Sequence, residues 1–180
     1  MRKLMGAIVL VAVGLWATAA LASDSDYASL GNDASNVAIG AGGIFLSGDD
    51  ALGAKQTEFL PTVNVSGLAK DWSWQVFYAF GDPQTVFGGS ADYILASNFD
   101  DCATCGSSSG QWWFGIGPSL IRSENVFEDA TGANGMSCTC YGGNVGFGWA
   151  SDHWNFQLYG HYLANSGDLA AQASINYTFN

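Results

Sequence analysis

Hydrophobic and polar residues alternate strictly along several segments of this chain. In the segment 154–162, Trp154, Phe156 and Leu158 alternate with Asn155 and Gln157. Such a period of two predicts β-strands with one apolar face, because successive side chains of a strand point to opposite sides of the sheet. The same alternation recurs in the segments 59–66, 72–80, 141–149 and 172–180.

Three segments with weaker alternation bring the number of predicted strands to eight. They are 36–47, about 90–99 and 112–122. No segment between the strands has a convincing helical pattern. The pattern therefore predicts an all-β chain.

The polar faces of these strands are unusually poor in charge. They carry mainly Asn, Gln, Ser, Thr and Gly, which suit a narrow enclosed interior better than a surface in water. We therefore expect an eight-stranded antiparallel up-and-down transmembrane β-barrel with its apolar side chains facing lipid. The side chains predicted to face lipid include Val63, Val76, Val145 and Leu158. Those predicted to face the lumen include Asn64, Gln75, Asn144 and Gln157.

The connections between the predicted strands give the barrel a direction. Lys70-Asp71 and Ser151-Asp152 are two-residue turns, whereas 48–55, 81–89 and 123–137 are longer. Outer-membrane barrels have short periplasmic turns and long external loops, so we expect both tight turns on the periplasmic side. This orientation also places six tryptophans at periplasmic strand ends, where we expect them to form half of an aromatic girdle. They are Trp72, Trp74, Trp112, Trp113, Trp149 and Trp154.

The first 22 residues have the pattern of a secretory signal peptide. Arg2 and Lys3 precede an apolar run, and Ala20-Leu21-Ala22 precedes a polar stretch. We expect cleavage after Ala22, an N-terminal periplasmic segment at 23–34 and a barrel at 35–180. The expected location is the cell outer membrane.

Composition and charge exclude other classes of protein. Charged residues make up 12% of the chain, and the formal net charge is −11. Beyond the signal peptide the basic residues are only Lys55, Lys70 and Arg122, too few and too dispersed for a nucleic-acid-binding stripe. We expect no nucleic-acid partner.

The signal peptide, the eight alternating segments and the final Ile175-x-Tyr177-x-Phe179 run resemble the small Gram-negative outer-membrane barrels. An eight-stranded barrel has an interior that side chains can fill, so we expect a non-enzymatic protein with a structural or surface-interaction role, or at most narrow porin-like solute passage. The resemblance implies contact with outer-membrane lipid and lipopolysaccharide, and recognition of the last strand by the barrel-assembly machinery. Asn180 follows Phe179, so the aromatic residue is penultimate, which departs from the usual pattern.

One motif favours an enzymatic alternative. Gly160-His161-Tyr162-Leu163-Ala164-Asn165 resembles the lipid A 3-O-deacylases, in which a His, then a Ser two residues on, begin a catalytic triad. Here Leu163 stands at the Ser position, and Ser166 lies three residues further on. We therefore expect no hydrolase activity and interpret His161 as a luminal residue hydrogen-bonded to amides such as Gln157 or Asn144.

The remaining chemistry-bearing residues point to no catalytic or cofactor site. Four cysteines in an exported chain favour disulfides, with three connectivities open. On the predicted topology one pair is periplasmic and the other external, so either both bridges are local or the fourth strand is misplaced. A four-thiolate zinc site has no standard spacing here, and the acidic loop residues match no calcium motif. We expect no metal or cofactor. The cysteines are Cys102, Cys105, Cys138 and Cys140.

Overall fold

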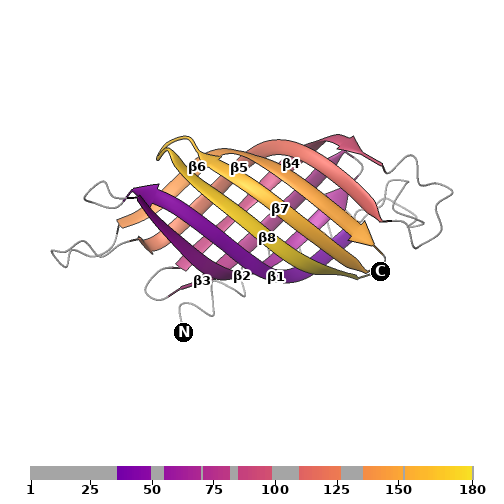
Figure 1. The fold of residues 1–180 in the computed structure, drawn as a ribbon, viewed down its shortest axis with the longest axis horizontal. Coiled ribbons are helices and arrows are strands. Elements are labelled where there is room, and N and C mark those ends of the chain that lie inside the picture. Colours follow the sequence, from indigo (N-terminus) through magenta and orange to yellow (C-terminus); the bar gives the residue numbers. More distant parts are fainter. Residues whose placement is uncertain are drawn as a thin grey trace.

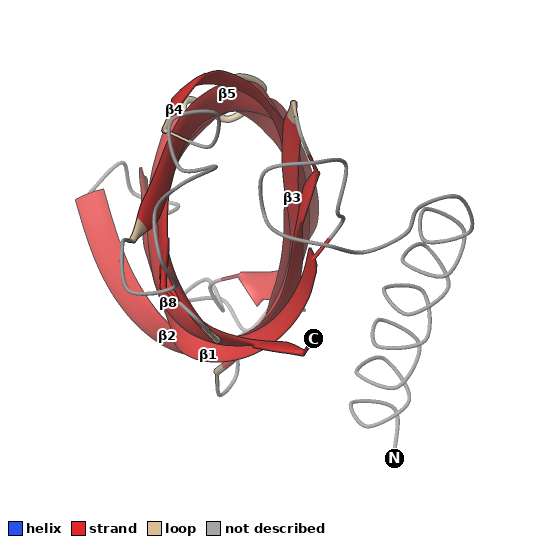
Figure 2. Cartoon of the chain, turned by 90° about the vertical axis from the view of Figure 1, so that its right-hand side faces the viewer, coloured by secondary structure: helices blue, strands red, loops and turns tan. Residues whose placement is uncertain are grey.

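Eight β-strands form one closed antiparallel barrel, in which each strand pairs with the next and β8 pairs with β1 (Figures 1 and 2). The computed structural model describes residues 36–49, 55–69, 71–81, 85–98, 110–126, 136–151 and 153–179. The strands are β1 (Asn36–Asp49), β2 (Lys55–Ala69), β3 (Trp72–Phe80), β4 (Thr85–Ser97), β5 (Gln111–Val126), β6 (Met136–Ser151), β7 (Trp154–Leu163) and β8 (Asp168–Phe179). The predicted fold class is confirmed.

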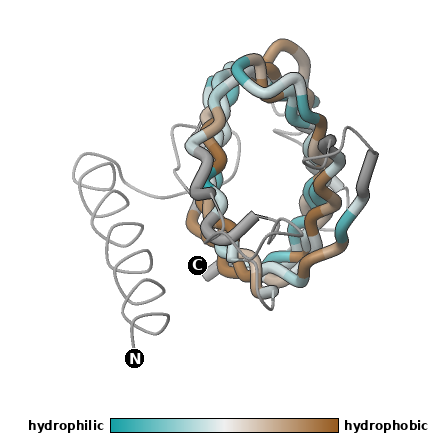
Figure 3. The backbone as a smooth tube through the Cα atoms, turned by 90° about the vertical axis from the view of Figure 1, so that its left-hand side faces the viewer, coloured by the Kyte–Doolittle hydropathy of each residue, from teal (hydrophilic) through white to brown (hydrophobic). Residues whose placement is uncertain are grey.

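The alternation of side chains follows the expected faces. Val63, Val145 and Leu158 are 42%, 50% and 42% exposed, whereas Asn64 and Gln157 are 2% and 1% exposed. Val76 is also on the outer face, and Gln75 and Asn144 are buried inside. Hydrophilic and hydrophobic residues alternate along the wall of the barrel in Figure 3. The barrel is therefore apolar outside, the reverse of a water-soluble barrel.

Both tight turns lie at the same end of the barrel, as predicted. This end, which we call the turn end, holds the connections 70–71, 98–110 and 152–153. The opposite end, the loop end, holds the connections 50–54, 81–84, 127–135 and 164–167. One connection at the turn end, 98–110, is long.

The prediction for the fourth strand was wrong at its start. We expected a loop at 81–89 and a strand at about 90–99, but β4 begins at Thr85 and ends at Ser97. The pattern hid this because Gly88 and Gly89 read as loop residues. In the barrel, Gly88 faces inward beside the Phe77 ring, so the glycine leaves room for a large neighbour.

The connection between β7 and β8 is a compact turn. The backbone N–H groups of Ser166 and Gly167 both donate to the carbonyl of Leu163, and Gly167 adopts a φ of 77°. Glycine is favoured there because a Cβ is strained at positive φ. The turn places Asn165 against β6.

The predicted signal peptide at 1–22 and periplasmic segment at 23–34 lie outside the described residues, as do Cys102 and Cys105. Within the part of the chain that is described, no helix has the length and apolar character needed to cross a membrane.

Candidate functional site: the barrel interior and outer surface

The middle of the interior is lined by buried neutral polar side chains. Two hydrogen-bonded bridges cross a strand there, each over an inward-facing glycine. Asn64 on β2 donates to Asn176 on β8 at 2.7 Å across Gly40 of β1. A side chain at Gly40 would collide with the Asn176 amide, so the glycine permits the bridge.

The second bridge contains a buried carboxylate. Asn144 on β6 donates to the Oδ1 atom of Asp92 on β4 at 2.5 Å. Gly117 of β5 pairs with Asn144 and lies against the Asp92 backbone, so the bridge again crosses a glycine. Asp92 is 0% exposed, and its Oδ2 atom has no protein hydrogen-bond partner. The sequence analysis did not identify Asp92 as an interior residue. The signal was present, because residues 90 and 92 lie two apart in a predicted strand and so share one face.

An apolar layer lines the interior toward the loop end. Every strand contributes at least one side chain to this single packed cluster. We call it the apolar cap; it consists of Ile44, Leu60, Phe77, Ala79, Val86, Ile121, Cys140, Leu163 and Ala170. The expectation of a polar lumen therefore holds only for the middle of the barrel.

A smaller apolar cluster lies in the interior at the turn end. It consists of Leu68, Trp113 and Tyr159, with Ile94 packed against them. Trp113 is 1% exposed, so the prediction that it belongs to an outer girdle was wrong. Gly146 and Gly148 make room for its ring inside, because a Cβ at either position would meet the indole.

His161 lies in the interior, as predicted, beside the amide of Gln172 rather than those of Gln157 or Asn144. Its side chain is 1% exposed and stacks on Tyr159, with ring centroids 6.0 Å apart. The amide of Asn144 donates to Asp92 and that of Gln157 to Ser66, and neither bonds the imidazole.

The rest of the deacylase-like motif is not arranged as a triad. Leu163 is buried in the apolar cap, whereas Ser166 is exposed in the 164–167 turn. Asn165 binds backbone instead: its Oδ1 accepts from Tyr141 N–H at 2.9 Å, and its Nδ2 donates to the Thr139 carbonyl at 3.0 Å. No hydroxyl nucleophile is presented beside His161 by this segment.

Two aromatic bands surround the outer surface. Near the turn end, four of the six predicted tryptophans are exposed, and two of them contact tyrosines edge-on: Trp72 with Tyr93 and Trp154 with Tyr177. The four tryptophans are Trp72, Trp112, Trp149 and Trp154. Near the loop end, a second band consists of Phe45, Phe59, Tyr78, Phe80, Tyr141 and Tyr162. Between the bands the outward residues include Val63, Ile116, Val145, Leu158 and Ile175.

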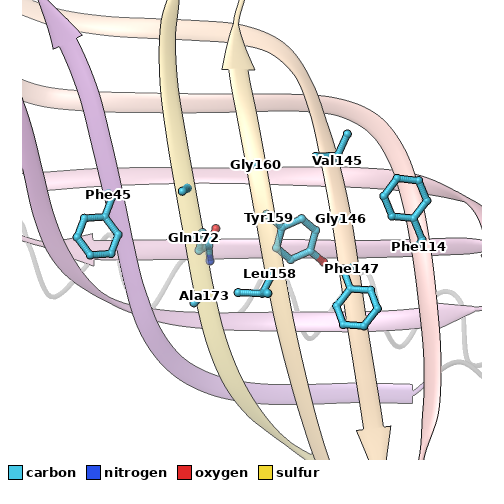
Figure 4. Close-up of a pocket in the computed structure, with 11 residues that line it drawn as sticks. Phe45, Phe114, Val145, Gly146, Phe147, Leu158, Tyr159, Gly160, Gln172 and Ala173 are labelled. Carbon is cyan, nitrogen blue, oxygen red and sulfur yellow. The ribbon is translucent and has the colours of Figure 1, made fainter.

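A hollow of about 460 Å³ lies between these bands (Figure 4). Its floor contains Gly160 of β7 and Ala171 and Ala173 of β8, and Phe45 and Phe147 stand on either side. The hollow arises because small residues interrupt a surface of large ones.

The described residues contain no group of three His, Cys, Asp or Glu side chains able to hold a metal ion. Cys140 is buried in the apolar cap. Cys102 and Cys105 lie outside the described residues, so the three connectivities of the four cysteines stay open. His153 is exposed and stacks on Tyr177.

Comparison with solved structures relates this fold to small bacterial barrels. The chain is similar to Neisserial surface protein A, with a TM-score of 0.51 and 16% identity over 81% of this chain and 98% of that one. It also matches the N-terminal β-barrel domain of Pseudomonas aeruginosa OprF, with a TM-score of 0.48 and 14% identity over 81% of this chain and 97% of that one. A third match is the Yersinia pestis attachment invasion locus protein Ail, with a TM-score of 0.41 and 11% identity over the same shares of the two chains.

The first of these matches supports the fold of a small eight-stranded outer-membrane barrel. No protein-family model matches the chain, and no curated protein matches it in sequence.

Proposed function

We propose that this protein is a non-enzymatic outer-membrane β-barrel with a structural or surface-interaction role. The observation that carries the proposal is its outer surface: among the described residues, 23 large hydrophobic side chains are exposed. A soluble monomer rarely exposes so extensive an apolar surface, whereas a barrel wall facing lipid requires one. The two aromatic bands match the positions of membrane–water interfaces.

The barrel interior supports a role other than solute passage. The apolar cap has members on all eight strands, and a second apolar cluster lies at the turn end. Eight-stranded barrels have interiors that side chains can fill. A hydrated solute would have to cross both apolar layers, so the interior favours structural support over transport.

The proposed partners follow from the same surface. Lipid acyl chains contact the belt between the aromatic bands, and lipopolysaccharide surrounds the loop end. The barrel-assembly machinery is the proposed partner of β8, whose outward Ile175 and Tyr177 are exposed.

Membrane fractionation with heat-modifiable gel migration tests the proposed location. We expect the protein in purified outer membranes, with a folded form that migrates differently after boiling. Recovery in the soluble periplasmic fraction without detergent would refute the proposal.

Mass spectrometry of lipid A tests the absence of hydrolysis. Cells expressing the protein and cells expressing His161→Ala should contain identical lipid A, because the described segment 160–166 presents no hydroxyl nucleophile beside the imidazole. Loss of an acyl chain that depends on His161 would instead support the deacylase alternative. Ser166→Ala is the matched control for the hydroxyl nearest in sequence.

A further inference from the structure

The hollow on the outer wall runs across the strands, from Phe45 on β1 to Phe114 on β5 (Figure 4). Strand pairing places its outward-facing lining on two neighbouring rows. One row consists of Phe45, Ala171, Gly160 and Val145, and the other of Ala173, Leu158, Phe147 and Phe114. The route from β1 to β5 through β8, β7 and β6 covers four strand spacings, or roughly 19 Å. The hollow is therefore elongated, with its smallest residues on β7 and β8.

The hollow offers only apolar contacts to an occupant from outside the barrel. Every lining residue that faces outward is Phe, Val, Leu, Ala or Gly. The backbone groups beneath are engaged in strand pairing, because each strand pairs with a neighbour on both sides. An occupant is therefore held by shape and dispersion contacts alone, without hydrogen bonds or charge.

The hollow is continuous with the lipid-facing wall of this transmembrane barrel, so alkyl chains surround it. Lipid chains are as apolar as the wall, and association inside a membrane therefore depends on close van der Waals packing. A chain lying over Gly160, Ala171 and Ala173 approaches the backbone closely and also touches the rings of Phe45 and Phe147. A flat part of the wall offers fewer such contacts.

The floor of the hollow lies near the aromatic band of the loop end. Along β7, Gly160 is two residues from Tyr162 of that band and six residues from Trp154 of the other band. Ala171 pairs with Phe45, which also belongs to the loop-end band. With the turn end on the periplasmic side, the floor lies in the outer leaflet, where lipopolysaccharide is the proposed lipid partner.

We propose that this hollow binds one acyl chain of lipid A, the lipid anchor of lipopolysaccharide. The proposal rests on the proposed function, because it needs a barrel in the outer membrane with its loop end outward. Gly160, Ala171 and Ala173 form the floor under the chain, and Phe45 and Phe147 hold it from the sides. One lipopolysaccharide molecule is thereby held at a fixed position on β7 and β8, while the lipids around the rest of the wall exchange.

Native mass spectrometry of the barrel extracted from outer membranes tests the proposal. The protein is produced in cells with a short lipopolysaccharide, extracted in mild non-ionic detergent and weighed with its retained lipids. The wild-type barrel should retain one lipopolysaccharide molecule. Ala171→Leu fills the floor and should lower the bound-to-free ratio roughly tenfold, equivalent to about 1.4 kcal/mol of lost contacts. Ala91→Leu adds the same side chain to the outer face of β4 and should leave the ratio unchanged.

Four outcomes would overturn the proposal. They are a wild-type barrel without retained lipid, a retained phospholipid in place of lipopolysaccharide, equal retention in Ala171→Leu, and a dimer whose partner copy occupies the hollow. Fractionation and heat-modifiable migration of the same preparation separate this proposal from the proposed function. A folded barrel in the outer membrane that retains no lipid refutes only the lipid site, whereas absence from the outer membrane refutes the proposed location.

A direct measurement covers the case in which Ala171→Leu fails to fold. In deuterated detergent, NMR of the wild-type barrel with its retained lipid should show nuclear Overhauser contacts between lipid alkyl protons and the methyl groups of Ala171 and Ala173. The methyl group of Ala91 should show none. Equal contacts at all three alanines, or none at Ala171 and Ala173, would refute the hollow as the binding site.

Discussion

Inward-facing glycines decide which side chains meet across the barrel interior. Gly40 and Gly117 each allow two polar side chains to hydrogen-bond over a strand, and Gly148 admits the Trp113 indole. Each of these contacts depends on the absence of one Cβ. Single methyl groups should therefore have large effects at some glycines and small effects at others.

Gly148→Ala and Gly143→Ala, both on β6, provide a matched test. The added methyl at Gly148 would overlap the Trp113 ring, whereas at Gly143 its nearest neighbour is the Gly117 carbonyl oxygen at 3.7 Å. Overpacking costs about 1–3 kcal/mol, so Gly148→Ala should lose that much stability and Gly143→Ala less than about 0.5 kcal/mol. Urea titrations in detergent measure both. Trp113→Leu should restore part of the loss at Gly148, and equal effects at the two glycines would contradict the packing of Trp113.

At the scale of elements, the 164–167 turn joins β7 and β8 and also holds the neighbouring strand β6. The Asn165 amide bonds two backbone groups of β6, and the Ala164 N–H donates to the Tyr141 carbonyl. Asn165, the Asn of the deacylase-like motif, therefore holds the turn against β6 and has no catalytic role in this arrangement.

Asn165→Ala removes both side-chain bonds from this turn and leaves the backbone bonds in place. Because each net hydrogen bond contributes about 0.5–1.5 kcal/mol and the site is exposed, we expect a loss of about 1 kcal/mol. Ser166→Ala should leave stability within about 0.5 kcal/mol. Urea midpoints and amide hydrogen exchange at Tyr141 measure the two effects. Unchanged exchange at Tyr141 in Asn165→Ala would show that Asn165 does not hold β6.

At the scale of the whole molecule, lipid and interior impose opposite demands on neighbouring residues. Val145 faces outward between the aromatic bands, and Asn144 faces the Asp92 carboxylate. Arg on the lipid face at mid-membrane costs roughly 2–4 kcal/mol. An Arg replacing Asn144 would instead have a carboxylate partner.

Val145→Arg should therefore fold into lipid vesicles much less well than Asn144→Arg. The folded fraction of each variant, measured by heat-modifiable gel migration across a urea series, gives the difference in folding free energy. Leu158→Arg serves as a second lipid-facing variant and should behave like Val145→Arg. Equal folding of the inward and outward variants would refute the membrane orientation of the wall.

The apolar cap predicts that the intact barrel conducts no ions. In planar bilayers the wild-type protein should show no channel events, whereas Phe77→Ala combined with Leu163→Ala should, because both side chains belong to the cap. Each truncation should also cost about 2–5 kcal/mol. Gel migration identifies the folded fraction before conductance is measured. Steady conductance by the folded wild-type barrel would show that the cap does not close the interior.

Residue patterning along the chain was enough to predict eight strands, the faces of the strongly alternating ones and the shared end of the two tight turns. Alternation with a period of two is a local property that each strand carries alone. Val145 and Asn144 could thus be assigned to opposite faces without any knowledge of their neighbours. The sequence also showed that position 163 is Leu163 and cannot supply a nucleophile, because this conclusion depends only on the type of residue.

The contents of the interior depend on contacts between strands that are far apart in the chain. Pairing within the closed barrel holds β4 and β6 on either side of β5, so Asp92 meets Asn144, which is 52 residues away in the chain. The same closure gathers inward apolar residues of all eight strands into the cap. Trp112 and Trp113 are consecutive tryptophans at one strand end, so they point to opposite faces. Trp113 is the one that points inward, because Gly146 and Gly148 leave space for its ring inside the barrel. Contacts between distant strands depend on the register of the strand pairs and on the tilt of the strands. The alternation of residues along one strand gives no information about either property.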